Sequence, residues 1–340
     1  MSQPIPAFME DYLDSLREKG RKESTIKRYQ YDLIDFSEWH QKSIGPLSLE
    51  AWSALSYENI TLFFDELIKV RSYKVRTTRR IYSVLQQLAR FCLSNGQVLT
   101  HAILHYKQPE LVDAPLSRNE WLNKSESDRL LTMIRSYEGL TENQMRGRPL
   151  LIDRNEFIAQ LFLSYGCSLH EVASLTTADV RFERNQLRIR SEKGISRIVT
   201  LTEDHKRLAY TYLTLIPEPV RPRLFSNEPF FVAFDFQRET FRWSYEEDRP
   251  KRLTEISIQK MLRLEVMRAS LRKGFSAMQL RHTFILRKLI DGADPFTIQQ
   301  YLGLKSPLSL RRYFLTIDQL STEEKLSLSE TATEALNVSK

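Results

Sequence analysis

The sequence predicts a two-domain, mainly α-helical protein with one small β-hairpin. Its 340 residues exceed what one compact core usually holds and suit two domains of ordinary size. Most apolar residues recur at helical spacing, whereas residues 187–201 alternate between apolar and polar side chains. The chain is 41% hydrophobic and 27% charged, a composition that indicates a globular protein and excludes a disordered one.

Residues 1–107 predict a helical domain with four helices, each with an apolar stripe. The first spans residues 6–19, and Ser24 is expected to N-cap the second. Ser56 begins the third helix, and Thr77 begins the fourth. Residues 108–124 contain two prolines and no helical periodicity, so they predict a linker.

The second domain is expected over residues 125–315. Its predicted elements follow in chain order: a helix opened by Ser125, a mostly buried helix over 154–175, the hairpin over 187–201, and helices over 255–273, 277–289 and 295–302. Residues 316–340 are acidic and predict a C-terminal tail, which is either solvated or used for self-association.

Several function classes lack their sequence signals. No apolar run approaches the roughly 18 residues of a membrane span, and no signal peptide is evident, so a cytoplasmic protein without a membrane partner is expected. Glycine-rich nucleotide loops are missing, so no cofactor is expected. His101 and His105 have no third ligand nearby, and Ser174 replaces the second histidine of a zinc helix that would begin at His170, so no metal is expected.

The basic residues gather in two stretches without acidic residues, although the net charge is only +7. One lies between Glu66 and Glu110, and the other between Glu265 and Asp291. Such clusters favour a polyanion, most often nucleic acid, over the alternative of an ordinary solvated face. The start of the predicted fourth helix also favours phosphate through its dipole and free N–H groups, and it carries four basic residues: Lys74, Arg76, Arg79 and Arg80.

Four segments resemble the C-terminal half of the tyrosine recombinase (phage integrase) family: QLRHTF at 279–284, GAD at 292–294, QQYLG at 299–303 and RY at 312–313. Upstream, residues 165–180 resemble the first arginine box of the family, and residues 192–201 resemble its lysine hairpin. The N-terminal helices resemble its SAM-like core-binding domain. The resemblance covers nearly the whole chain and implies the tyrosine recombinase architecture, a helical core-binding domain followed by an α+β catalytic-like domain.

The resemblance matches Lys193, Arg281 and Tyr313 to catalytic positions of the family. In such enzymes the tyrosine attacks a DNA phosphodiester, arginines hold the non-bridging oxygens, and the lysine protonates the leaving oxygen. Three other catalytic positions, an arginine and two histidines in the family, are occupied here by Ser168, Met278 and Leu304.

Serine supplies no guanidinium, and the loss of a transition-state arginine costs roughly 10³–10⁵ in rate by analogy with arginine fingers. These substitutions therefore predict a protein that is not an enzyme. Rescue by His170 or Arg184 is the alternative considered.

The expected function is sequence-specific binding of double-stranded DNA without recombination, as a transcriptional repressor of a phage or mobile element. In this respect the chain resembles the recombinase-derived repressors of SPβ-like prophages. An active recombinase using Tyr313 is the alternative, and an accessory protein for another integrase is a weaker one. A regulatory protein or peptide is a further expected partner. The predicted DNA contacts are Lys27, Arg28, Lys74, Arg76, Arg79, Arg80, Lys193, Arg197, Arg281, Arg311 and Arg312.

Overall fold

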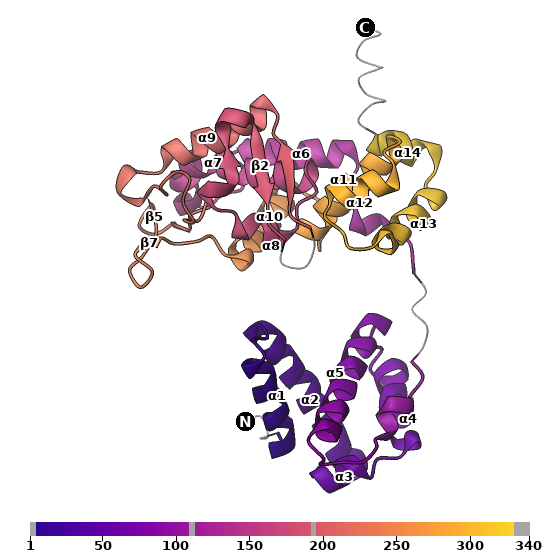
Figure 1. Ribbon diagram of the computed structural model, residues 1–340. Coiled ribbons are helices and arrows are strands. Elements are labelled where there is room, and N and C mark those ends of the chain that lie inside the picture. Colours follow the sequence, from indigo (N-terminus) through magenta and orange to yellow (C-terminus); the bar gives the residue numbers. More distant parts are fainter. Residues whose placement is uncertain (1–4, 109–112, 192–194, 330–340) are drawn as a thin grey trace. The chain divides into compact units, whose positions relative to one another are not determined.

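The chain folds into two compact units, residues 1–112 and 113–340 (Figure 1). The computed structural model describes residues 5–108, 113–191 and 195–329. The first unit has one hydrophobic core. The second has a large core around its longest helix and a smaller one near its C-terminal helices. The expected fold class, mainly helical with small antiparallel sheets, is confirmed. Among the described residues no helix is long and apolar enough to cross a membrane.

The first unit is entirely helical in the residues described. Its elements are α1 (Ala7–Glu18), α2 (Glu23–Ser43), α3 (Leu49–Ser53), α4 (Tyr57–Asp65), the π-helical turn η1 (Glu66–Val70), α5 (Val75–Ser94) and the 3₁₀ turn η2 (Ala102–His105). Helix α1 packs on α2 and α5. The ring of Phe36 lies edge-on to Trp52 and Phe63 at centroid distances of 5.5 and 5.0 Å, so α2, α3 and α4 share one aromatic core.

Three details of this unit differ from the sequence prediction. Lys22, not Ser24, is the N-cap of α2, and its side chain makes no capping hydrogen bond. Ser24 lies one residue inside the helix. Helix α5 begins at Val75, two residues before Thr77. Helix α3 was not predicted because five residues are too few to show a period, although Trp52 anchors it in the core.

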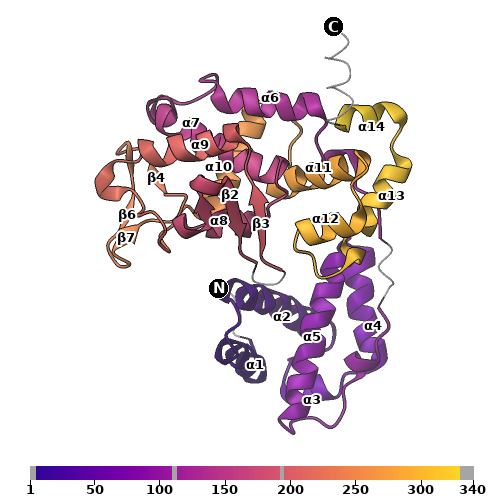
Figure 2. The same cartoon turned by 45° about the horizontal axis from the view of Figure 1, so that its top comes forward.

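The second unit begins with α6 (Lys124–Arg135), α7 (Glu142–Leu163) and α8 (Leu169–Ser174), preceded by the 3₁₀ turn η3 (Arg118–Glu120). A three-stranded antiparallel sheet follows: β1 (Val180–Arg181), β2 (Gln186–Ile189) and β3 (Arg197–Thr200), with the 3₁₀ turn η5 (Phe182–Arg184) between β1 and β2. Strands β2 and β3 lie side by side and form the predicted hairpin (Figure 2), in the register Gln186↔Thr200 to Ile189↔Arg197. The predicted turn at Lys193 lies outside the described residues.

The rest of the unit is mostly helical. Its elements are α9 (Glu203–Leu215), the pairs β4 (Phe234–Asp235) with β5 (Thr240–Phe241) and β6 (Trp243–Ser244) with β7 (Arg249–Pro250), α10 (Glu255–Arg268), α11 (Ala277–Ile290), α12 (Pro295–Tyr301), α13 (Arg311–Gln319) and α14 (Thr322–Leu328). Helix α7 contacts α6, α9 and α11, so it forms the centre of the large core.

The predicted helix over residues 154–175 is wrong at both ends. Helix α7 starts at Glu142, where Thr141 and Gln144 form a capping box, and it ends at Leu163. A turn then precedes α8, and Gly166 occupies it with a φ of +59°. A Cβ at Gly166 would lie 2.5 Å from the ring of Phe284, so the turn needs glycine both for its backbone conformation and for this close contact.

The predicted boundary at residue 315 falls inside α13, and the chain beyond it is not a solvated tail as far as residue 329. Helix α14 packs against α6 and α11. Leu328 is fully buried, and the Ser329 hydroxyl donates a hydrogen bond to Asp291 at 2.6 Å. The acidic composition did not indicate that the segment packs on the second unit, because Leu328 and Ser329 are its buried residues within 321–329. Residues 330–340 lie outside the described residues.

Candidate active site

Ser168 caps α8 at the position where the resemblance led us to look for an arginine. Its hydroxyl accepts a hydrogen bond from the Glu171 backbone N–H at 3.3 Å, and the Glu171 carboxylate accepts one from the Ser168 N–H at 2.6 Å. This capping box satisfies N–H groups at the start of α8. It also fixes the Glu171 side chain beside its own helix start.

The Glu171 carboxylate joins two arginines from distant parts of the chain. Arg197 on β3 donates to it at 2.6 and 3.3 Å, and Arg281 on α11 lies 3.4 Å from its Oε2 atom. Burial alone raises the pKa of Glu171, but the hydrogen bonds and charge of Arg197, with smaller contributions from Ser168 and Arg281, leave that pKa below its ordinary value. Glu171 therefore stays ionised and orients both guanidinium groups.

The placement of Arg197 argues against the direct DNA contact expected for it. Its side chain is 6% exposed and is held by Glu171 inside the unit. The sequence placed Glu171 within a family motif but gave it no role, and Arg197 only a surface role. The signal available in the sequence for the Glu171–Arg197 pair was an acidic residue, Glu171, three positions after the predicted catalytic position Ser168.

Tyr313 on α13 is buried in the smaller core of the second unit. Its ring lies 5.6 Å from the ring of His282, at an angle of 76°. Burial raises the pKa of the Tyr313 phenol to about 12, and the nearby charges of Arg281 and Arg312 reduce that increase. The structure thus brings Tyr313 and Arg281, two of the family-matching residues, into one electrostatic neighbourhood.

Glu120 on the turn η3 contacts both α11 and α13. The Glu120 carboxylate lies 3.2 Å from Arg312, and the Glu120 carbonyl lies 3.1 Å from a His282 ring nitrogen. Burial lowers the pKa of His282 to about 4, so this histidine is neutral at pH 7. The neighbouring Arg311 has a largely exposed side chain and lies 3.7 Å from Asp113.

Met278 and Leu304, at the two positions where the family has catalytic histidines, supply no proton donor. Met278 is 56% exposed on the first turn of α11. Leu304 packs on the smaller core. Of the two residues considered for rescue, His170 lies 2.7 Å from the Glu255 carboxylate, and Arg184 is exposed on η5. Lys193, the third family-matching residue, lies outside the described residues.

The chain just after Lys193 contacts the site through its backbone. The Ile195 N–H donates a hydrogen bond to the Gly303 carbonyl at 3.3 Å. Gly303 has a φ of +65°, and a Cβ on it would collide with the Ile195 carbonyl oxygen. The end of the hairpin loop is therefore docked directly on the turn that precedes Leu304.

In the first unit, the predicted DNA-contacting residues lie on α2 and α5. Lys74 is the N-cap of α5, and Arg76 is exposed on its first turn. Together with Arg28 and Arg80, Lys74 lines a hollow of about 410 Å³. Lys27 is exposed on α2, and Arg79 is half-buried.

Arg80 differs from its neighbours because it is already paired. It donates two hydrogen bonds to the buried Asp32 carboxylate, at 2.8 and 2.7 Å, which tie α5 to α2. This bidentate geometry uses the same guanidinium edge that would otherwise grip a phosphate. A free DNA-binding Arg80 was the expectation, and the sequence could not show Asp32 as its partner.

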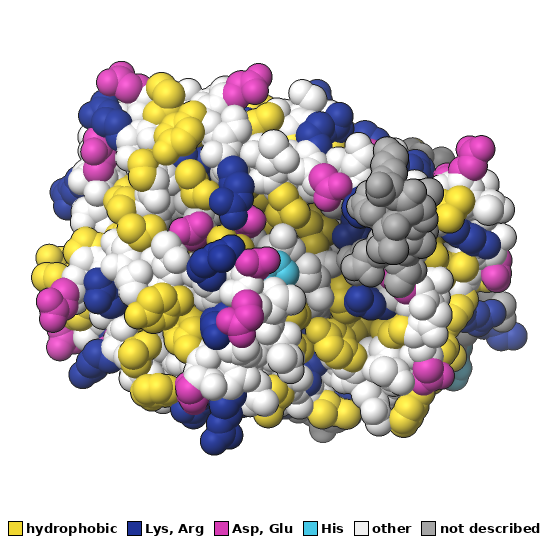
Figure 3. All heavy atoms as spheres, turned by 90° about the horizontal axis from the view of Figure 1, so that it is seen from above, with side chains coloured by type: hydrophobic (Ala, Val, Ile, Leu, Met, Phe, Trp, Pro, Cys, Tyr) yellow, Lys and Arg dark blue, Asp and Glu magenta, His cyan; other side chains and the backbone are white. Residues whose placement is uncertain are grey.

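Figure 3 views the face of the protein seen from above Figure 1. Lys and Arg side chains on that face are interspersed with Asp, Glu and hydrophobic side chains. Among the described residues seen on this face, no large field of one sign forms, so this view shows no extended basic surface for a polyanion.

Comparisons with known proteins match both units. Residues 120–318 match the model of the phage integrase family, and residues 9–96 match that of the phage integrase N-terminal SAM-like domain. Tyrosine recombinase XerC of Chlamydia trachomatis serovar L2 is 26% identical over 311 residues, covering 87% of this chain and 88% of that protein. Tyrosine recombinase XerD of Pseudomonas putida is 26% identical over 299 residues, with 87% and 88% covered.

Solved structures share the fold. A lambda integrase dimer bound to a COC' core site aligns with a TM-score of 0.61 and 13% identity, covering 93% of this chain and 96% of that one. XerH bound to a palindromic difH substrate also aligns at 0.61, with 18% identity and coverage of 88% and 79%. The relatives XerC and XerD are named as recombinases, which contradicts the expectation that this chain is not an enzyme.

Proposed function

Because the chain belongs to the phage integrase family of tyrosine recombinases, we propose that it cleaves and rejoins double-stranded DNA at a specific site through Tyr313. The observation that carries the proposal is the grouping of Tyr313 with Arg281, whose guanidinium is oriented by Glu171. A nucleophile and an oriented phosphate ligand are the minimum that this chemistry needs.

The proposed step is a transfer of a phosphoryl group between oxygens. The Tyr313 hydroxyl attacks the phosphorus and releases its proton to water, while the bond from phosphorus to the 5′ oxygen of the next nucleotide breaks. The products are a 3′-phosphotyrosyl bond and a 5′-hydroxyl, with Lys193 proposed as the donor of the proton to that hydroxyl. Arg281 offers its donors to the non-bridging oxygens, where negative charge accumulates.

Ser168, Met278 and Leu304 bring neither charge nor a transferable proton to this site. We therefore propose a slow enzyme, because the phosphate meets one arginine where related enzymes present two. The high pKa of Tyr313 acts in the same direction, since the phenol must lose a proton in a buried place.

DNA binding precedes this chemistry and depends on other residues. We propose that Lys27, Arg28, Lys74, Arg76 and Arg79 contact phosphates from the first unit. Arg281, Arg311 and Arg312 are the corresponding residues of the second. The structural relatives include complexes with DNA and a dimer, which supports duplex DNA and a second copy of the chain as partners.

A DNA-binding regulator of a mobile element is the second candidate. The substitutions at three catalytic positions favour it, because they remove catalytic groups and leave the predicted DNA contacts in place. Regulation through occupancy needs only the DNA-binding residues.

The test has two steps because the target site is unidentified. Genomic fragments retained by the purified chain are sequenced first. The recovered site is then made with a nick near the expected cleavage position, so that a small fragment diffuses away and traps the covalent adduct. We expect an adduct that resists sodium dodecyl sulfate with the unmodified chain and none with Tyr313→Phe, at nearly unchanged DNA affinity.

Two results would contradict the proposal. An adduct that persists in Tyr313→Phe would assign the nucleophile elsewhere. Tight binding of many promoter fragments without any adduct would leave only the regulator.

A further inference from the structure

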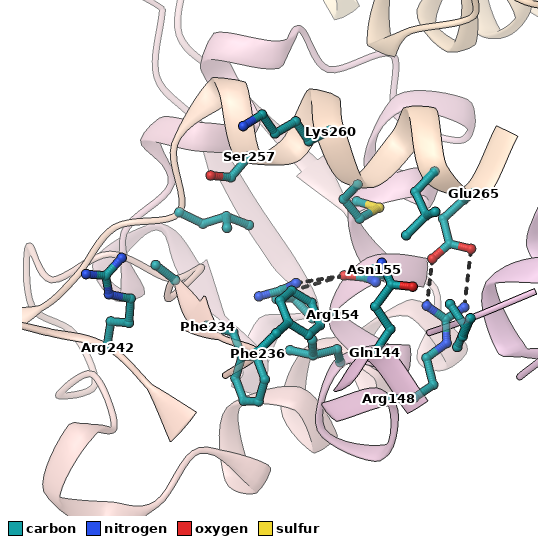
Figure 4. A pocket seen from close by; sticks show the side chains of 16 residues that line it. Gln144, Arg148, Arg154, Asn155, Phe234, Phe236, Arg242, Ser257, Lys260 and Glu265 are labelled. Carbon is teal, nitrogen blue, oxygen red and sulfur yellow. Dashed lines mark hydrogen bonds and ion pairs between the residues drawn. The ribbon is translucent and has the colours of Figure 1, made fainter. Parts of the chain in front are cut away.

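A cavity of about 380 Å³ lies in the second unit, away from the candidate active site (Figure 4). Its walls come from α7, α10 and the segment around β4. This volume is at the lower end of the range of about 300–1,000 Å³ found for small-molecule sites. Half of the 16 lining residues are apolar: Leu140, Leu151, Ala233, Phe234, Phe236, Leu253, Met261 and Leu264.

Arg154 of α7 brings a buried positive charge to this apolar cavity. It is 4% exposed, and it donates to the Asn155 side-chain oxygen at 3.2 and 3.0 Å and to the Val232 carbonyl at 3.2 Å. Figure 4 shows these bonds to Asn155 inside the pocket. Among the residues that the structure describes, no carboxylate pairs with Arg154.

A buried arginine without a counter-charge is unusual. Burying a charge is costly unless an opposite charge offsets it, and burial here lowers the pKa of Arg154. A guanidinium has five N–H donors, and three are used by the bonds described. The remaining donors suit the two oxygens of a carboxylate.

The other charged residues of the lining do not supply a counter-charge for Arg154. Glu265 is the acidic lining residue, and it is already engaged by Arg148 at 2.6 Å and by Arg268. Arg242 and Lys260 also line the pocket and are exposed, so they add positive charge where the pocket meets solvent. The lining as a whole therefore has an excess of positive charge around apolar walls.

Gly147 on α7 allows the wall formed by Phe234 to pack closely on this helix. A Cβ at Gly147 would lie 2.8 Å from the ring of Phe234, so the ring packs directly on α7 at this point. Phe236 stands beside Phe234 at a centroid distance of 5.3 Å and is 41% exposed. The two rings thus form an aromatic wall that continues from the buried part of the pocket to its open side.

We propose that this pocket binds a small amphipathic carboxylate, with the carboxylate on Arg154 and the apolar body against Phe234, Phe236 and Met261. A free inorganic anion fits less well because the apolar half of the lining offers it no hydrogen bond. A neutral apolar molecule fits less well because it leaves Arg154 without a counter-charge. The site does not depend on recombinase activity.

The experiment is isothermal titration of the full chain with two carboxylates, octanoate and 3-phenylpropionate. Neutral 1-octanol tests whether the apolar body of the ligand is sufficient for binding. Inorganic phosphate tests whether a negative charge is sufficient. We expect binding of at least one carboxylate and much weaker binding of octanol and phosphate. Octanol binding as well as octanoate, phosphate binding as well as either carboxylate, or no carboxylate binding would each overturn the proposal.

Variants assign the binding to this pocket. Arg154→Met is expected to weaken carboxylate binding at least tenfold, because a charge-assisted pair of hydrogen bonds is lost. Arg207→Met, at an arginine that is 75% exposed on α9, is the matched control and should bind normally.

A variant of the exposed wall keeps the test valid if Arg154→Met does not fold. Phe236→Ser removes part of the apolar wall at a half-exposed position and is expected to weaken octanoate about threefold or more, without a change in the thermal unfolding temperature. Unchanged octanoate binding in this variant, or in a folded Arg154→Met protein, would place the ligand outside this pocket and overturn the proposal.

Discussion

At the scale of single residues, Glu171 organises the candidate active site. Its carboxylate holds Arg197 and Arg281, which lie 26 and 110 residues further along the chain. The resemblance to the family selected Arg281 and Tyr313 as candidates, because its motifs are short segments that can be matched one by one. The pairing with Arg197 could not be predicted, since nothing local specifies which buried arginine a carboxylate meets.

Glu171→Gln should destabilise the second unit by about 3 kcal/mol, because it removes one partner of a buried ion pair and leaves Arg197 without a counter-charge. The folded-state pKa of Glu171 lies below its ordinary value of 4.5. Its contribution is therefore fully present above that value and is lost as the pH falls through the folded-state pKa.

Urea unfolding at pH 7 and at low pH measures this effect. The variant should lose less stability on acidification than the unmodified chain. Glu142→Gln, at a side chain that is 80% exposed, is the control. Equal acid sensitivity of Glu171→Gln and the unmodified chain would contradict the assignment.

At the scale of elements, the sequence predicted best where one face of an element is apolar. The β2–β3 hairpin and α5 have clear periods and were found close to their observed bounds. Helix α7 is buried on most sides and contains Pro149, so its period is weak and its first three turns were missed. Helix α14 was missed because its acidic residues outnumber the few that pack.

Leu328→Ala tests whether α14 is part of the folded unit. The side chain is fully buried, so the loss of its packing should cost about 2–4 kcal/mol. Leu326→Ala, at a residue of the same helix that is 57% exposed, should cost much less. Differential scanning calorimetry compares the two, and equal unfolding temperatures would show that α14 contributes nothing to the fold.

Asp32→Asn tests the tie between α2 and α5. The Arg80 side chain is 31% exposed, so we expect a modest loss of about 1–2 kcal/mol in the first unit. Asp65→Asn, which removes the exposed ion pair with Lys69, should have almost no effect. Chemical unfolding followed by the fluorescence of Trp39 and Trp52 measures both variants. An unchanged free energy of unfolding in Asp32→Asn would refute the structural role of Arg80.

At the scale of the whole molecule, the basic residues of the two units differ in how they are held. Those near Tyr313 are held by carboxylates and are candidates for catalysis. Lys74 and Arg76 at the start of α5 are exposed and are candidates for salt-dependent affinity. DNA binding can therefore be altered at α5 while the candidate active site is left intact.

The double variant Lys74→Ala with Arg76→Ala should weaken DNA binding and flatten its dependence on salt. Each lost phosphate contact reduces the slope of log affinity against log salt by about 0.9, so a total change of about 1.8 is expected. Fluorescence anisotropy over a range of salt concentrations measures the slope. Lys19→Ala with Lys42→Ala, at two exposed lysines of the same unit, is the control, and an unchanged slope in the first double variant would exclude this surface.

The contact between Ile195 and Gly303 limits which residues position 303 accepts. Backbone meets backbone there, and a Cβ on residue 303 would overlap the Ile195 carbonyl oxygen. Any residue other than glycine would therefore have to push the chain at Ile195 away from the turn that precedes Leu304. One added methyl group is enough to separate the two segments, so their contact depends on glycine at this position.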